Sequence, residues 1–402
     1  MSLKRISYLL LPVCLISAAG LFIACGKSPS GPDNGPTPSV LTAVADTTEV
    51  ALSWTRCPDE DFFSYTLYRS YVAGIAGDTL SAEKLGILTL PDVLSFNDYT
   101  LEQTTAYYAL RTTNAAGLSV WSNEEVVVLG GYIVAWEKNY DGQCDVPYPN
   151  NGFTAVAAGW DHSLGLRNDG SIAAWGGNEY GQCDVPSPNS GFIAIAAGYY
   201  HSLGLKSDGS IVAWGENDDG QCDVPSPNSG FTAVAGGFYH SLGLRTDGSI
   251  AAWGRNDSGQ CDVPYPNNGF TAVAAGYNYS LGLRNDGSIA AWGRNIEGQC
   301  DIPDPNTSFI AVAAGGFHSL GLRDDGSITA WGRNDEGQCN VPSPNSGFIA
   351  VAAGYYHSLG LRDDGSIVAW GGNGYGQCDV PPPNSGFTAV AAGVIHSLGL
   401  KE

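Results

Sequence analysis

The feature that most constrains this chain is a 39-residue repeat that runs from about residue 130 to the C-terminus. Trp136, Trp175 and their successors to Trp370 stand 39 residues apart, and the cysteines from Cys144 to Cys378 keep the same period. A fixed period of this size is typical of a solenoid or a propeller. Each unit contains the apolar runs "FTAVAAG" and "SIVAW" and the alternating run "HSLGLR", with the hairpin signal "DG" before the last strand. One unit therefore predicts a three-stranded antiparallel blade.

The two ends of the repeat region lack complementary strands. The region opens with "GGYIVAW", a third strand without the two before it, and it ends with "HSLGLKE", which lacks a third strand. Residues 130–402 span seven periods, so that pairing the two ends leaves no strand over. An open solenoid would need polar capping repeats instead. We therefore expect a seven-bladed β-propeller of short three-stranded blades, closed by its N- and C-terminal strands.

Residues 39–129 predict a separate, smaller β-sandwich. The segments "VALSW", "FSYTLYRS", "AYYALRTTN" and "NEEVVVL" alternate apolar and polar positions between turn-rich stretches. The unit resembles a fibronectin type III domain, with Trp54 on the second strand and Leu101 and Tyr107 placed like the tyrosine corner of that family. Its single cysteine, Cys57, is expected to be buried, and we expect no chemistry in this unit. Together the two regions predict an all-β protein.

The repeat also carries a recognisable family pattern. The string "AAGxxHSLxLxxDGSIxAWGxNxxGQ" resembles the regulator-of-chromosome-condensation type of repeat. The short unit with "GQxxVPxPNSGFxAVAAG" is similar to the bacterial beta-lactamase inhibitory protein II family, which implies an exported seven-bladed propeller. That resemblance also implies a target-binding face formed by aromatic turns. For function it is only an analogy, because one scaffold hosts many activities.

The N-terminus reads as an export signal. Lys4 and Arg5 precede an apolar run that ends in "LFIAC", which resembles a bacterial lipobox. We expect a signal peptide at residues 1–24, lipid attachment at Cys25, and a Pro/Gly/Ser-rich flexible tether at residues 25–38. An ordinary cleaved signal, which would give a secreted protein, and an uncleaved anchor are the alternatives. The expected location is the bacterial cell envelope, at the outer membrane or the cell surface.

The charge of the chain excludes one class of partner. With 18 basic and 40 acidic residues, the formal charge is −22. Such a surface repels phosphate backbones and anionic headgroups, so we expect no nucleic-acid partner and membrane contact only through the lipid. We expect a monomer.

By strand parity, the residues that differ between repeats gather at one end of the blades. If the first strand runs up, the "GxxHS" turn and the "WGxNxxGQ" loop both lie on top, and the "DGS" turn lies below. The differing turn positions hold Trp160, Asp161, Tyr199, Tyr200, Phe238, Tyr239, Tyr277, Asn278, Gly316, Phe317, Tyr355, Tyr356, Val394 and Ile395, and the loops add Tyr140, Tyr180, Tyr375, Arg255, Arg294 and Arg333. Aromatic residues and arginine are enriched in binding hot spots, so this face is expected to bind a protein or a glycan. The alternative is that half of the rings only pack between blades.

The polar residues that recur in the repeats favour structural roles. One histidine recurs in six blades, at His162, His201, His240, His318, His357 and His396, with Tyr279 in the remaining one. Two ring nitrogens sharing a zinc ion at about 2.1 Å would need a ring of only about 4 Å radius, so we expect structural hydrogen bonds and no metal. For the seven "GQC" cysteines we expect buried free thiols. The "DGS" aspartates, such as Asp169 and Asp208, are expected to bond turn backbone, with calcium binding as the alternative.

No catalytic constellation stands out from the repeat pattern. A catalytic site needs a nucleophile or an acid/base pair within hydrogen-bond reach. No histidine lies outside the repeated set, and no Ser/His/Asp grouping is singular to one blade. We therefore expect a non-enzymatic, surface-anchored binding protein without cofactors. The alternatives are an envelope hydrolase or lyase with a site on the same face, a structural spacer, and an inhibitor of a beta-lactamase-like enzyme.

Overall fold

The structure is a computed structural model in which every described element is a β-strand. It describes residues 36, 38–45, 50–60, 62–70, 75, 82–90, 92–98, 105–128, 131–137 and 139–401. The expected signal peptide, Cys25, most of the tether and Leu101 lie outside these residues. Within the described part, no helix is long and apolar enough to cross a membrane. The expectation of an all-β protein is confirmed for these residues.

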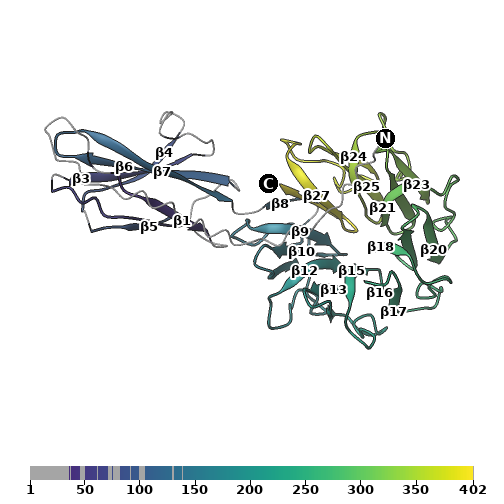
Figure 1. The fold of residues 1–402 in the computed structure, drawn as a ribbon. Coiled ribbons are helices and arrows are strands. Elements are labelled where there is room, and N and C mark those ends of the chain that lie inside the picture. Colours follow the sequence, from purple (N-terminus) through teal and green to yellow (C-terminus); the bar gives the residue numbers. More distant parts are fainter. Residues whose placement is uncertain are drawn as a thin grey trace, which may run out of the picture.

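The N-terminal region forms two antiparallel sheets around one core (Figure 1). One sheet has the order β1-β2-β5 and the other the order β4-β3-β6-β7. The strands are β1 (Leu41–Ala45), β2 (Val50–Trp54), β3 (Phe62–Ser70), β4 (Glu83–Leu88), β5 (Ser95–Asp98), β6 (Thr105–Asn114) and β7 (Ser119–Val128). Cys57 is buried in this core, as expected. The alternation of apolar residues places one face of each sheet against the other.

From residue 131 on, the chain forms seven three-stranded antiparallel sheets, one for each period of the repeat. The first strands are β9 (Phe153–Ala158), β12 (Phe192–Ala197), β15 (Phe231–Gly236), β18 (Phe270–Ala275), β21 (Phe309–Ala314), β24 (Phe348–Ala353) and β27 (Phe387–Ala392). The second strands are β10 (His162–Arg167), β13 (His201–Lys206), β16 (His240–Arg245), β19 (Tyr279–Arg284), β22 (His318–Arg323), β25 (His357–Arg362) and β28 (His396–Lys401). The third strands are β11 (Ile172–Gly176), β14 (Ile211–Gly215), β17 (Ile250–Gly254), β20 (Ile289–Gly293), β23 (Ile328–Gly332), β26 (Ile367–Gly371) and β8 (Tyr132–Glu137).

The incomplete first and last units complete each other. Strand β8 pairs antiparallel with β28, from His396 opposite Glu137 to Lys401 opposite Tyr132, and the sheet order is β27-β28-β8. This last sheet also meets the first one, because the Val394 amide donates to the Gly159 carbonyl at 3.2 Å. Chain segments more than 230 residues apart are thus joined by main-chain hydrogen bonds.

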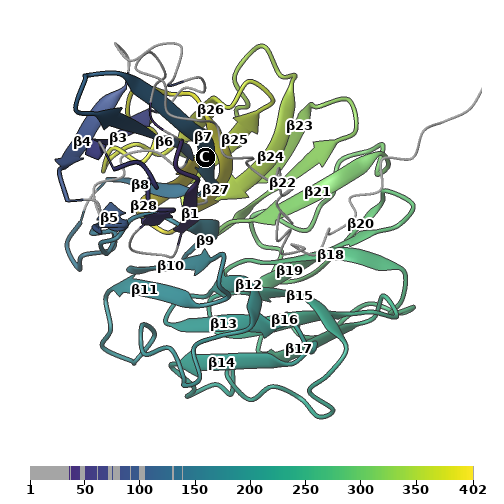
Figure 2. The same ribbon diagram turned by 60° about the vertical axis from the view of Figure 1, so that its left-hand side comes forward.

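Each sheet packs on the next through a repeated apolar cluster. In one cluster Leu164, Leu166 and Ile172 of one sheet contact Phe192 and Trp214 of the following sheet. Each of these side chains is less than a tenth exposed, and burying one such side chain contributes about 2 kcal/mol. The first strands of neighbouring sheets contact one another, whereas third strands such as β14 and β17 lie outermost (Figure 2). Stability in such an array is the sum of many similar neighbour contacts.

The register places both variable segments of a repeat at one end of the sheet. His162 at the start of β10 pairs with Gly176 at the end of β11, and the Gly177 amide donates to the Asp161 carbonyl at 2.7 Å. The "GxxHS" turn and the "WGxNxxGQ" loop are therefore neighbours, as strand parity predicts. We call this end of the repeat region, with its turns and loops, the variable face.

Candidate functional site

The first of the two turn residues of every repeat lines one cavity in the centre of the variable face. These residues are Trp160, Tyr199, Phe238, Tyr277, Gly316, Tyr355 and Val394, and we call them the inner ring. The cavity has a volume of about 150 Å³, and its lining is completed by the pair that precedes each turn, which is Ala-Gly in six repeats and Gly236-Gly237 in the other. All seven sheets thus contribute to one site.

The aromatic members of the inner ring pack on one another. The ring centroids of Trp160 and Tyr199 are 4.2 Å apart, those of Tyr199 and Phe238 3.5 Å, and those of Phe238 and Tyr277 4.1 Å. Tyr355 lies 6.2 Å from Trp160 and 6.1 Å from Tyr277, nearly perpendicular to both. Such distances are those of contacting rings, so no ligand group fits between them. The inner ring is therefore a packed aromatic cluster at the mouth of the cavity.

The gap at Gly316 belongs to the same packing. A Cβ atom on Gly316 would lie 2.8 Å from the Cδ2 atom of Tyr355. Real Cβ contacts are not this short, so any side chain here would displace the Tyr355 ring. The absence of a side chain in one turn thus makes room for the aromatic residue of the next.

The second turn residues surround the inner ring and are partly exposed. Tyr200 stacks with Tyr180 from the preceding repeat, with ring centroids 4.6 Å apart and planes 30° apart. Tyr140, Tyr180 and Tyr375 are 69%, 45% and 44% exposed. We call this set, which consists of Asp161, Tyr200, Tyr239, Asn278, Phe317, Tyr356, Ile395 and the three loop tyrosines, the outer ring. Its turn members are half-buried and its three loop tyrosines are exposed, so the outer ring is accessible to a partner.

Three arginines from consecutive repeats lie against outer-ring aromatics. The guanidinium carbon of Arg255 is 5.6 Å from the centroid of the Tyr239 ring, and that of Arg294 is 5.5 Å from Phe317. Arg333 lies 5.7 Å from Phe317 and 5.6 Å from Tyr356. These are cation–π distances. Arg255 also donates through Nε to Asp257 at 2.7 Å, and Arg333 to Asp335 at 2.9 Å.

Burial raises the pKa of the two inner-ring tyrosines Tyr199 and Tyr355. Desolvation raises the pKa of Tyr199, and the hydrogen bond and charge of Tyr200 raise it further. Desolvation, together with Tyr356 and Tyr277, raises the pKa of Tyr355 to about 12. At neutral pH these groups offer neutral hydroxyls for hydrogen bonding rather than phenolates.

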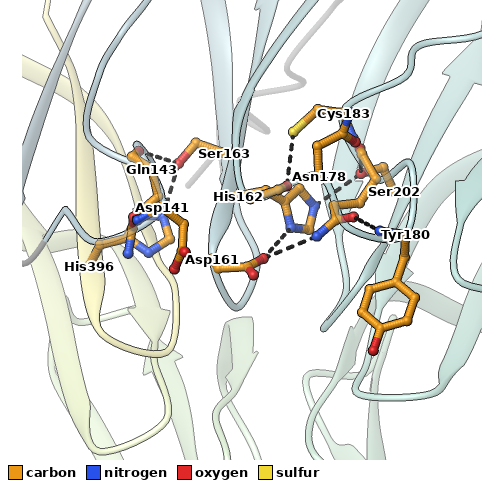
Figure 3. Close-up of polar contacts among 12 residues, drawn as sticks. Asp141, Gln143, Asp161, His162, Ser163, Asn178, Tyr180, Cys183, Ser202 and His396 are labelled. Atoms are coloured by element: carbon orange, nitrogen blue, oxygen red, sulfur yellow. Dashed lines mark hydrogen bonds and ion pairs between the residues drawn. The ribbon is translucent and has the colours of Figure 1, made fainter.

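Directly beneath the turns, the recurring histidines form a hydrogen-bonded layer between sheets. His162 Nε2 lies 3.0 Å from Ser202 Oγ in the next sheet, and His396 Nε2 of the last sheet lies 2.9 Å from Ser163 Oγ of the first (Figure 3). The Ser163 hydroxyl donates to the Gln143 carbonyl at 2.9 Å, so the histidine must donate through its Nε2–H. The same pairs recur at His201, His240, His318 and His357. The expectation of structural hydrogen bonds is confirmed.

Tyr279 replaces histidine in this layer by a different bond. Its hydroxyl donates to the backbone carbonyl of His318 and accepts from Ser319 Oγ at 3.1 Å. The tyrosine therefore also joins its sheet to the next. Both residue types are fully buried.

The structure brings together one Asp, His and Ser grouping that the sequence reading missed. Asp161 is unique to its repeat, and its Oδ1 lies 3.9 Å from Nδ1 of His162, whose Nε2 contacts Ser202 (Figure 3). The sequence pattern of a single repeat does not reveal this grouping, because Ser202 belongs to the next repeat. However, His162 and Ser202 are fully buried, and the Ser202 hydroxyl donates to the Gln182 carbonyl at 2.9 Å. A nucleophile needs access and a proton aimed at its base, so this grouping is part of the layer.

The cysteines and turn aspartates also have structural partners. The seven repeat thiols are unpaired and partly buried, where full burial was expected, and Cys183 Sγ donates to the Gly177 carbonyl at 3.3 Å. Desolvation raises the pKa of Cys183 to about 12, so it is an unreactive thiol at neutral pH. Asp169 Oδ1 accepts from the Ser171 amide at 2.8 Å, as expected for the "DGS" turns. Within the described residues, no group of three or more His, Cys, Asp or Glu side chains could hold a metal ion.

Glu137 is a further residue whose environment the sequence reading missed. It stands where the other repeats have the glycine of "WG", and it keeps the positive φ of those glycines, at 112°. Both carboxylate oxygens are buried without a hydrogen-bond partner. Desolvation and the charge of Asp379 raise its pKa to about 9. The signal was present, because Glu137 breaks an otherwise uniform "WG" pair.

Known proteins share both the repeat and its fold. The regulator of chromosome condensation (RCC1) repeat model matches residues 153–182, 192–221, 231–260, 270–299, 309–338 and 348–377. Yeast RCC1 (Prp20), solved in complex with Kap60, superposes with a TM-score of 0.58 at 20% identity, over 68% of this chain and 89% of that chain. Human WBSCR16 superposes with a TM-score of 0.55 at 17% identity, over 68% of this chain and 99% of that chain. The CRINKLY WD40 ectodomain of the Arabidopsis thaliana receptor kinase ACR4 gives 0.50 at 23% identity, over 60% and 90%.

At these identities the structural likeness shows the fold alone. No curated protein is significantly similar to the chain in sequence. The repeats, the three-stranded sheets and the structural neighbours agree, and the chain is thus a repeat protein whose RCC1-like repeats build the blades of a β-propeller.

Proposed function

We propose that the protein is a non-enzymatic binding protein of the bacterial cell envelope, which binds a protein or a glycan through its variable face. In this proposal residues 130–402 are a closed seven-bladed propeller, residues 39–129 are a fibronectin type III-like spacer, and the chain acts as a monomer. The observation that carries the proposal is the outer ring, in which exposed tyrosines and aromatic rings in contact with arginine guanidinium groups lie on one face. Residues of these types dominate binding hot spots.

The contrast with the rest of the repeat supports this interpretation. The layer beneath the turns is uniform in six repeats, whereas only two of the seven repeats share the same pair of turn residues above it. Packing explains the inner ring, but the outer-ring tyrosines are up to 69% exposed. The hydrolase alternative has less support, because the one Asp, His and Ser grouping is buried. The structural neighbours named above include a protein solved with its protein partner, which supports a binding role by analogy.

The experiment that tests the function is capture of envelope components from the source bacterium by the immobilised protein. The test variant carries Tyr200→Ala, Tyr239→Ala and Tyr356→Ala, all in the outer ring. The matched control carries Tyr148→Ala and Tyr265→Ala, which remove tyrosines that are 83% and 97% exposed near the opposite end of the blades. A component retained by the control and lost from the test variant identifies the ligand. Equal capture by all three proteins contradicts the proposal.

The expected anchor has its own test. We propose that Cys25 is lipidated and that residues 25–38 tether the folded regions to the membrane. Labelled fatty acid should enter the protein in cells, and Cys25→Ser should abolish the label and release the protein from membranes. Labelling that persists in the Cys25→Ser variant contradicts this proposal.

A further inference from the structure

The three arginines of the variable face differ in how their charge is balanced. Two positions supply acidic side chains near Arg255 and Arg333: the position two residues after the arginine, and one position in the corresponding loop of the preceding repeat. Arg255 has its hydrogen bond to Asp257, which raises its pKa, and the charges of Asp257 and Asp219 add to that effect. Burial lowers the pKa of Arg333, but its hydrogen bond to Asp335 and the charges of Asp335 and Glu297 outweigh this. The guanidinium groups of Arg255 and Arg333 therefore each have an acidic partner within the protein.

Arg294 lacks both of these acids. The position two residues after it is Ile296, where Asp257 and Asp335 stand in the flanking repeats. In the loop of the preceding repeat, where Asp219 stands near Arg255 and Glu297 near Arg333, the residue equivalent to them for Arg294 is Ser258. Arg294 Nε is buried and has no hydrogen-bond partner. Two separate departures from the repeat pattern thus leave one guanidinium uncompensated on a chain of net charge −22.

The surroundings of Arg294 are apolar on one side and open on the other. Its guanidinium lies 5.5 Å from the Phe317 ring centroid, and Ile296 beside it is 76% exposed. A carboxylate is the natural partner of a planar guanidinium, and the two can form a pair of parallel hydrogen bonds. The neighbouring apolar surface suits the methylene groups of an acidic side chain.

We propose that Arg294 is the anion-recognition point of the variable face and pairs with an aspartate or glutamate side chain of a partner protein. This inference rests on the proposed binding function and narrows its ligand to a protein. A sugar ring would need a free aromatic face, but the Phe317 ring already has two guanidinium groups within 6 Å. An exposed aliphatic residue such as Ile296 also contacts protein side chains better than sugar hydroxyls.

The test uses a displayed library of random 12-residue peptides, panned against the full-length protein. We expect enriched peptides to share an acidic residue. Replacing that residue by its amide, or Arg294→Gln in the protein, should weaken binding by about 10- to 100-fold, the range for a hydrogen bond to a charged group. Thermal unfolding of each variant verifies that it folds.

Two further variants change the charge balance without removing Arg294. Ser258→Asp supplies the missing upstream acid and should weaken peptide binding by about 10-fold, because Arg294 then has an internal partner. Ser187→Asp adds the same charge at an exposed position near the opposite end of the blades and should leave binding unchanged.

The outcomes separate this inference from the proposed function. Neutral peptides that lose binding in the Tyr200, Tyr239 and Tyr356 alanine variant, but not in Arg294→Gln, overturn the role of Arg294 and leave the face a binding site. Acidic peptides that bind Ser258→Asp as tightly as the unchanged protein also overturn it. Peptides indifferent to both sets of substitutions contradict the inference and the proposed function together.

Discussion

Two layers of each repeat lie one residue apart in sequence and follow opposite rules. In the histidine layer, six of seven repeats place the same ring against the serine of the next sheet, at 2.8 to 3.0 Å. In the turn directly above, no two repeats carry the same residue pair except "YY" at Tyr199 and Tyr355. The layer is fully buried, and in it each histidine Nε2–H has a fixed acceptor in the serine of the next sheet, whereas the histidine Nδ1 atoms are buried without a hydrogen-bond partner. The turns reach solvent, and their residues are free to differ.

The difference shows which positions of the sequence the fold constrains and which it leaves free to vary. A buried donor without an acceptor costs about 1 to 3 kcal/mol, and seven such errors would exceed the stability of most domains. The outer ring carries no such penalty, so the fold does not fix which residues stand there.

The largest expected effect is unfolding in acid. Burial lowers the pKa of His201, His318, His357 and His396 to about 3 and that of His240 to about 4, whereas an unfolded histidine has a value near 6.5. The folded pKa is depressed, so this stability is complete above pH 6.5 and is lost as the pH falls from 6.5 towards 4. Each histidine steepens the loss by about 1 kcal/mol per pH unit, and five together by about 5 to 7.

Denaturant unfolding at pH 7.5, 6 and 5 measures this dependence. Glu137 acts in the opposite direction, since its raised pKa favours the folded state at low pH, but it is one group against five. A free energy of unfolding that stays constant from pH 7.5 to 5 would show that the layer is accessible to water and its histidines unshifted.

The next effect contrasts the two layers within one repeat. Ser202→Ala removes the acceptor of the His162 Nε2–H and should lower the free energy of unfolding by about 1 to 3 kcal/mol. Tyr200→Ala, two residues earlier in the partly exposed turn, should lower it by about 1 kcal/mol or less, because it removes only ring contacts with Tyr180 and Tyr199. Chemical denaturation compares the two variants. If Tyr200→Ala proved the more damaging, the turn would have to be counted with the structural core.

Sequence reasoning reached the repeated part of this architecture and stopped at its exceptions. The period of Trp136 to Trp370 and the "DG" turns predict the blade, and the unpaired "GGYIVAW" predicts the pairing of β8 with β28. The packing of Tyr355 over Gly316 could not be predicted, because it depends on which ring leans over which neighbour. The Asp161, His162 and Ser202 grouping crosses a repeat boundary that local patterns do not span.

A smaller effect is expected where the framework itself departs from its pattern. Glu137→Gly restores the glycine of the other "WG" pairs and relieves a non-glycine residue at φ 112°. We expect stabilisation by about 1 kcal/mol at neutral pH, because positive φ is strained for residues with a Cβ atom. The folded pKa of Glu137 is raised from 4.5 to about 9, so its stability contribution is complete below pH 4.5 and is lost as the pH rises.

The pH dependence separates the two causes in this variant. The gain from Glu137→Gly should be larger at pH 8.5 than at pH 5, and thermal unfolding at both values measures it. Glu137→Gln removes the charge but keeps a side chain at positive φ. Its gain in the free energy of unfolding should therefore be smaller than that of Glu137→Gly, because the backbone strain remains. A Glu137→Gly variant less stable than the parent at both values would mean that the carboxyl group has a partner in the folded protein.

The smallest effect concerns the one natural exception in the histidine layer. Tyr279→His should change the free energy of unfolding at neutral pH by about 1 kcal/mol or less, because the new imidazole can donate to Ser319 as its equivalents do in the other repeats. The same variant should steepen the loss of stability below pH 6.5, since it adds a sixth buried histidine of the depressed kind. His240→Tyr is the reciprocal change and should make that loss shallower. Opposite shifts in slope, with little change at neutral pH, would show that the layer accepts either residue for bonding and that only histidine makes it sensitive to acid.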